Sequence, residues 1–180
     1  MNRLKSFVVI AALVAAFPAL AQRARLSPHE TISARFNGSL VTIVYGRPYT
    51  KSPKTHETRK IWGGLVKWDK ADRLGADEAT TLLTQKPLKF GDTTIPAGTY
   101  TLYIIASEKG TSKLAFSSNI GKWGIPVDET HDVARVDLKK DTIENPVDQL
   151  TISIDKSDDG GVLKISWENT QFSAPFTLSS

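Results

Sequence analysis

Alternation of apolar and polar residues at a period of two runs through most of this chain and constrains its fold more than any other feature. Residues 29–36 alternate in this way, with Ala34 and Phe36 on the apolar side. Asn37-Gly38 follows, and residues 40–45 resume the alternation. Side chains on a strand alternate between faces, and Asn-Gly favours a tight type I′ turn. This stretch therefore predicts a β-hairpin.

Similar patterns continue to the end of the chain. Residues 99–107 are apolar on both faces, which is typical of a central strand, and residues 113–118 are expected to pair back on it. Further strands are expected at residues 80–84, 88–90, 133–138, 150–154, 162–167 and 172–178. No long segment has helical periodicity. The sequence thus predicts an all-β, single-domain antiparallel β-sandwich, with a jelly roll or a barrel as alternatives.

The first 21 residues have the features of a signal peptide. Arg3 and Lys5 precede an apolar stretch over residues 7–20, and Ala19-Leu20-Ala21 offers small residues for cleavage. The apolar stretch is shorter than the roughly 20 residues that span a bilayer. We expect an exported protein, periplasmic or extracellular, whose mature domain covers residues 22–180 and has no membrane span.

The composition limits the kinds of partner that the protein could bind and the covalent chemistry that it could carry. The net charge of +4 falls to +2 when the two basic residues of the expected signal peptide are removed. The remaining charges of both signs are scattered along the chain, which does not favour nucleic-acid binding. The chain has no cysteine, so disulfides are excluded. No feature of the sequence indicates an oligomeric state.

One long irregular segment, Arg59–Thr81, interrupts the strand pattern and is where a β scaffold is expected to place its function. It brings aromatic and ionisable residues close together, and Arg47 precedes it. Arginine binds carboxylates and phosphates through paired hydrogen bonds, and tryptophan offers a flat face to a sugar ring. The candidate ligand-binding residues are Arg47, Arg59, Trp62, Trp68, Arg73, Asp77 and Glu78.

Three interpretations of this segment compete. The favoured one is a non-catalytic module that binds a glycan or a small anion in the cell envelope. In the structural alternative, Arg73 pairs with Glu78 and the tryptophans only plug the end of the sheet. In the enzymatic alternative, Glu78 is the catalytic residue of a hydrolase, with an arginine stabilising the anion. On a strand Asp77 and Glu78 would point to opposite faces, so a shared target requires a turn between them.

Other catalytic and metal-binding patterns are missing from the sequence. The histidines are His29, His56 and His131, and none has a metal-ligand spacing. No nucleophile motif such as Gly-x-Ser-x-Gly occurs. We therefore expect no metal site and no cofactor, and a binding or structural role is favoured over an enzymatic one.

Several phrases, in order along the chain, resemble the DUF2911 family of exported bacterial proteins, a domain of unknown function. They are SPHET at 27–31, YGRPY at 45–49, RKIWGGLV at 59–66, RLGADEAT at 73–80, IPAGTYTL at 95–102, KWG at 122–124 and WE at 167–168. The resemblance implies export, one domain and a β-rich fold, but no activity. The chain departs from the family pattern in a longer polar stretch between Pro48 and Arg59. It also has Asp72 where an aromatic residue is more usual.

Overall fold

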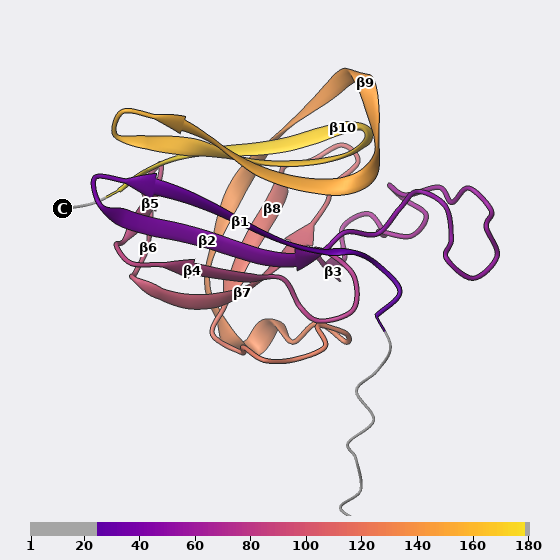
Figure 1. Cartoon of the computed structure of the whole chain (residues 1–180), viewed down its shortest axis with the longest axis horizontal. Helices are drawn as coiled ribbons and strands as arrows, with labels where there is room; N and C mark the ends of the chain where they lie inside the picture. The colour runs from indigo at the N-terminus through magenta and orange to yellow at the C-terminus, as the bar shows by residue number, and fades with distance from the viewer. Residues whose placement is uncertain (1–24, 179–180) are drawn as a thin grey trace, which may run out of the picture.

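The computed structural model describes residues 25–178, which form ten antiparallel strands joined into one continuous sheet (Figure 1). The strand order is β1-β2-β4-β7-β8-β9-β10-β5-β6, with the short β3 paired on β7. The strands are β1 (His29–Phe36), β2 (Ser39–Gly46), β3 (Ala71–Arg73), β4 (Thr81–Thr84), β5 (Leu88–Phe90), β6 (Thr93–Ile95), β7 (Gly98–Ile105), β8 (Ser112–Ser117), β9 (Asp132–Ser157) and β10 (Gly160–Leu178). Within residues 25–178 there is no α-helix, and the 3-10 turn η1 covers Glu129–His131.

Local sequence explains the first hairpin. Ala34 and Phe36 of β1 are buried, while Ser33 and Arg35, which alternate with them, are exposed. Asn37 and Gly38 have φ values of 45° and 86°, the positive values that a type I′ turn requires. β7 is buried on both faces, as expected of a central strand, and pairs with β8. The all-β, single-domain prediction is confirmed.

The long strand β9 folds the sheet over on itself. Residues 132–138 pair with β8, and residues 139–142, 147 and 151–157 pair with β10. Within the pairing with β10 the register shifts on both sides of Glu168, whose φ is 53°. Extra residues in one strand bend it and increase its twist. The predicted sandwich therefore arises from one bent sheet, whose inner faces meet where Phe36 and Phe176 pack edge to face at 5.6 Å.

The two layers are also joined directly at one end. Beyond β2, Thr50 N–H donates to the carbonyl of Asp148 at 2.7 Å. The Tyr45 hydroxyl accepts a hydrogen bond from the Ile152 N–H at 3.0 Å and donates to the Glu30 carboxylate at 3.0 Å. Burial of this hydroxyl raises the pKa of Tyr45 to about 12. These bonds hold β2 against β9 beside the irregular segment.

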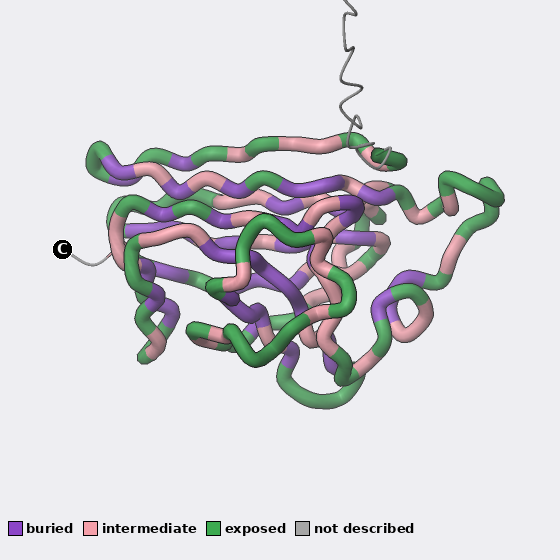
Figure 2. The backbone as a smooth tube through the Cα atoms, turned by 90° about the horizontal axis from the view of Figure 1, so that it is seen from below, coloured by how far each residue is buried: buried purple, intermediate pink, exposed green. Residues whose placement is uncertain are grey.

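Part of the chain between β2 and β3, which includes the residues just before the irregular segment, projects from this end of the sandwich (Figure 1). Residues 53–58 are all exposed, in contrast to the buried residues that gather between the layers (Figure 2). Over residues 25–178 the structure contains no helix long and apolar enough to cross a membrane. The expected signal peptide lies outside the described residues.

Candidate functional site

The first half of the irregular segment closes the end of the core. Trp62 is 7% exposed and packs edge to face on Trp167 and Phe172, with ring centroids 6.4 and 4.9 Å away. Its indole N–H donates to the Trp167 carbonyl at 3.2 Å. Trp68 stacks on Trp62 at 6.4 Å, and the Lys140 ammonium lies 5.2 Å from the Trp68 ring. Both predicted tryptophans are therefore held by contacts within the protein.

Arg47 is fully engaged in joining the layers. Its Nε donates to the Leu150 carbonyl at 3.1 Å, and its Nη2 donates to the Thr151 hydroxyl at 2.8 Å. Nη1 forms an ion pair with Glu30 at 3.0 Å. All three nitrogens of this guanidinium thus have partners inside the protein, and Arg47 has little capacity left for a ligand.

Arg59 is held differently. Its Nε donates to the Thr50 carbonyl at 3.3 Å and its Nη2 to the Tyr49 carbonyl, so both partners are uncharged. In residues 25–178 no carboxylate forms an ion pair with this half-buried guanidinium. Burial lowers the pKa of Arg59, which means that its charge is only partly compensated.

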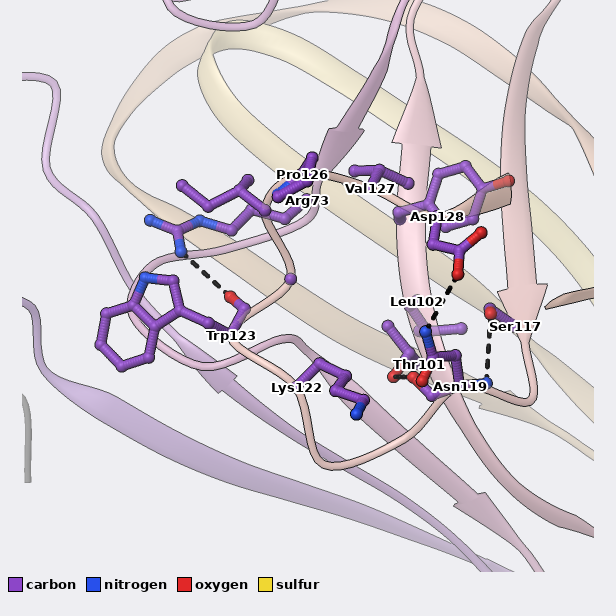
Figure 3. Close-up of a pocket in the computed structure, with 13 residues that line it drawn as sticks. Arg73, Thr101, Leu102, Ser117, Asn119, Lys122, Trp123, Pro126, Val127 and Asp128 are labelled. Carbon is purple, nitrogen blue, oxygen red and sulfur yellow. Dashed lines mark hydrogen bonds between the residues drawn. The ribbon is translucent and has the colours of Figure 1, made fainter. Parts of the chain in front are cut away.

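Arg73 lies on β3 and donates hydrogen bonds to two loops. Its Nη1 donates to the carbonyl of Asp77 at 2.7 Å and to that of Trp123 at 3.1 Å (Figure 3). The guanidinium carbon is 5.8 Å from the centre of the Trp123 ring. Burial lowers the pKa of Arg73, although Asp77 and Asp72 act in the opposite direction. Like Arg59, it has no ion pair with a described residue.

Asp77 and Glu78 do not pair with Arg73 through their side chains. Glu78 accepts two hydrogen bonds from Arg25 Nε at 3.0 and 3.1 Å, which lowers the pKa of its carboxyl. The expected Arg73–Glu78 pair of the structural alternative is therefore wrong, because Arg25 takes the glutamate. Asp77 has a φ of 63°, so the backbone turns at this residue. The turn brings the carboxylates of Asp77 and Glu78 to 3.4 and 3.5 Å from His29 Nε2.

Asp72 is a site residue that the sequence analysis noted only as a departure from a family pattern. It faces the interior, since its register partner on β7 is the core residue Ile104. Its carboxylate has no hydrogen bond or ion pair with any residue in the described range. Burial raises the pKa of Asp72 to about 6, while Arg73 acts in the opposite direction. The signal in the sequence that marks it is an aspartate at a position where the family pattern usually has an aromatic residue.

Some of the residues described above line a hollow of about 180 Å³ beside β3, which we call the β3 hollow. Trp167 also lines it, and its buried indole N–H has no acceptor in the described part of the chain. The lining is formed by Leu26, Ser27, Pro48, Pro53, Arg59, Leu65, Val66, Asp72, Arg73, Gly75, Ala76, Asp77 and Trp167. Of the predicted site residues, Arg59, Arg73 and Asp77 meet here, whereas Arg47, Trp62, Trp68 and Glu78 do not line it.

A larger hollow of about 280 Å³ lies on the other side of Arg73, between β7, β8 and the loop that follows β8 (Figure 3). The sequence analysis missed it. Several of its polar groups bond to one another. Thr101 donates to the Asn119 carbonyl at 2.8 Å, and the Asn119 amide reaches Asp128 at 3.4 Å. Because the β3 hollow combines two guanidinium groups that form no ion pair with a described residue and an N–H donor without an acceptor among those residues, it is the better candidate site.

The described residues that line the two hollows do not form a metal-binding site. Among residues 25–178 no group of three or more histidine, aspartate or glutamate side chains is arranged to hold a metal ion.

Comparison with known proteins gives one match. A family model described as "Protein of unknown function (DUF2911)" matches residues 27–176. No curated protein and no solved structure matches the chain.

Proposed function

The chain belongs to the DUF2911 family of proteins of unknown function, and we propose that it is a non-catalytic module that binds a small anionic ligand in the β3 hollow. The observation that carries the proposal is the Arg59 guanidinium, which lines the hollow half-buried and without a carboxylate partner in the described residues. The N-terminal sequence supports export, so the ligand is proposed to be one found in the cell envelope or outside it.

Electrostatics support an anion as the ligand. A half-buried cation loses part of its hydration, and a bound oxyanion restores that stabilisation through charge-assisted hydrogen bonds. Arg59 and Arg73 contribute two positive charges to the lining, and Asp77 contributes one negative charge. Asp72 adds a second negative charge only when it is ionised, and burial opposes its ionisation. The hollow thus gains net positive charge as the pH falls.

The volume of the β3 hollow and its hydrogen-bond donors further restrict the kinds of ligand that would fit. The volume of about 180 Å³ is below the range of roughly 300–1,000 Å³ that is usual for drug-sized molecules. A single uronic acid or another small carboxylate is a better match to this volume. The Trp167 N–H supplies a donor for an additional ligand oxygen, because it has no acceptor among residues 25–178.

The hydrolase alternative gains no support from the geometry. A general acid needs a carboxyl whose pKa is raised. Arg25 has the opposite effect on Glu78, lowering the pKa of its carboxyl. Glu78 also does not line the β3 hollow.

The test is isothermal titration of the mature protein with galacturonate, sulfate and, as an uncharged control, galactose. We expect the two anions to bind and galactose to bind at least about tenfold more weakly, since each charge-assisted hydrogen bond to an ion contributes about 1.5–3 kcal/mol. Arg59→Gln should weaken anion binding by a similar factor, whereas Arg35→Gln, at an exposed arginine of β1, should not.

Arg59 also holds two loop carbonyls, so a second variant separates binding from folding. Asp72→Asn removes a negative charge from the lining without shortening the side chain, and it should tighten anion binding near neutral pH. Absence of binding by both anions, or equal anion affinity in wild type, Arg59→Gln and Asp72→Asn, would overturn the proposal.

A further inference from the structure

The projecting part of the chain is strongly basic, in contrast to the rest of the molecule. We call residues 50–70 the basic projection. It contains six lysine or arginine residues and two acidic ones, whereas the rest of the described chain contains fourteen basic and seventeen acidic residues. The basic residues of the projection are Lys51, Lys54, Arg59, Lys60, Lys67 and Lys70. The positive charge is therefore concentrated on one protrusion (Figure 1).

These cations are not neutralised by the fold. None of the six forms an ion pair with a residue in the range 25–178, and the five lysines are exposed. Elsewhere in the described range ion pairs are common, as between Lys164 and Asp155 at 2.5 Å and between Lys139 and Asp141 at 2.9 Å. A cluster of unpaired surface cations produces a local positive potential that attracts anions.

The basic projection is continuous with the β3 hollow. Pro53, Arg59 and Leu65 belong to the projection and also line the hollow. We propose that the ligand is an acidic polysaccharide, one of whose carboxylated or sulfated units enters the β3 hollow while neighbouring units lie along the lysines of the basic projection. This inference rests on the proposed function for the unit in the hollow, and it adds the polymer and the surface that binds it.

The shape of the site favours a polysaccharide over other polyanions. A flat anionic membrane does not enter a concave hollow, whereas the end of a chain does. Single-stranded nucleic acid is bound by stacking bases on accessible aromatic side chains. The two tryptophans of the basic projection do not offer such a platform, because Trp62 is buried and Trp68 stacks on it.

The test compares galacturonate with an oligogalacturonate of about ten units, at about 0.15 M salt where long-range attraction is screened. We expect the oligomer to bind at least about tenfold more tightly than the monomer, since several exposed charge pairs add to the affinity. The triple variant Lys54→Gln, Lys60→Gln, Lys67→Gln should lose most of this advantage and leave monomer affinity unchanged.

A matched control carries the same change of net charge elsewhere. Lys89→Gln, Lys109→Gln, Lys122→Gln alters three exposed lysines outside the basic projection and should keep the advantage of the oligomer. Raising the salt concentration should weaken oligomer binding by wild type and by this control in parallel. The salt series also tests the inference if the projection variant does not fold.

The outcomes separate the two proposals. If the monomer binds and the oligomer binds no more tightly, or if both triple variants weaken the oligomer equally, the polysaccharide inference is wrong and the proposed function stands. Lysine-dependent binding of the oligomer that survives Arg59→Gln, with no monomer binding, would refute the β3 hollow as the site. Tighter lysine-dependent binding to phosphatidylglycerol vesicles or to single-stranded DNA would assign a different partner to the projection.

Discussion

Replacing Asp72 by asparagine should stabilise the protein at neutral pH. The side chain lies on the inner side of β3, half-buried, with no hydrogen bond or ion pair to a described residue. Ionised carboxylates in such places lose hydration without compensation, so the charged form destabilises the folded state. Asparagine keeps the size of the side chain and removes the charge.

The magnitude follows from the pKa of Asp72, which burial raises from 3.8 to about 6. A difference of this size corresponds to about 3 kcal/mol at roughly 1.4 kcal/mol per pH unit. The side chain is partly solvated, which reduces the effect to about 1.5 kcal/mol. For a domain of this length, such a gain raises Tm by about 3–6 °C.

The gain should depend on pH in a definite direction. Below the unfolded pKa of 3.8 the carboxyl is protonated in both states, so the substitution gains nothing there. As the pH rises towards about 6, the folded protein still holds its proton while the unfolded chain loses it, and the wild type is progressively destabilised. Above about 6 the difference between variant and wild type is complete.

Thermal unfolding followed by circular dichroism between about pH 4 and pH 8 measures this difference directly. Buffers without carboxylate, phosphate or sulfate are needed, since these are ligands of the proposed site. Asp92→Asn is the matched control, because Asp92 lies exposed in the turn between β5 and β6. A lower Tm for Asp72→Asn at neutral pH, or an equal gain at both ends of the range, would refute the argument from desolvation.

Three other substitutions test the contacts around the site. Tyr45→Phe leaves the backbone groups of Ile152 without the hydroxyl, so unfolding assays should show a loss of about 1–3 kcal/mol. Gly46→Ala should lower Tm sharply, because a Cβ atom there would lie 2.2 Å from the carbonyl oxygen of Ala76; an unchanged Tm would contradict this close approach. Glu78→Ala removes a partly exposed carboxylate that contacts Arg25 and His29, so Tm should fall by no more than about 4 °C, and a larger fall would assign Glu78 a structural role.

Much of the fold was predictable because the alternation of apolar and polar residues along a strand reflects which of its side chains are buried. The first hairpin follows from period-two alternation and an Asn-Gly turn, both of which are local. The strands predicted at residues 150–154 and 162–167 are also confirmed, and they pair with each other, with Ile152 opposite Ile165. The continuity of β9 was not predicted, because polar residues and Pro146 between residues 138 and 150 interrupt the apolar pattern. The extra residues of β9 opposite Glu168 allow the whole range to form one long strand.

The candidate site was less predictable, because its contacts join residues far apart in the sequence. Glu78 pairs with Arg25, 53 residues away, so the expected partner on the same segment was wrong. Arg47 and Arg59 look alike in the sequence, yet one is saturated by β9 and Glu30 while the other lines a hollow. Residue type gives the chemistry of an arginine, whereas the number of its free donors depends on the tertiary structure.

Dividing the irregular segment into two parts allows a binding site and a structural plug to be tested separately. Its first half buries Trp62 against Trp167, so substitutions there should lower stability and binding together. Arg59 at the start of the segment and Asp72 on β3 carry charges that form no ion pair with a described residue, and charge of this kind is a cost to stability unless a ligand offsets it. Under the proposed function, substitutions at Arg59 and Asp72 should therefore change ligand affinity in opposite directions while the packed tryptophans stay in place. Opposite effects on affinity at these two positions would be difficult to explain for a segment that serves only to close the core.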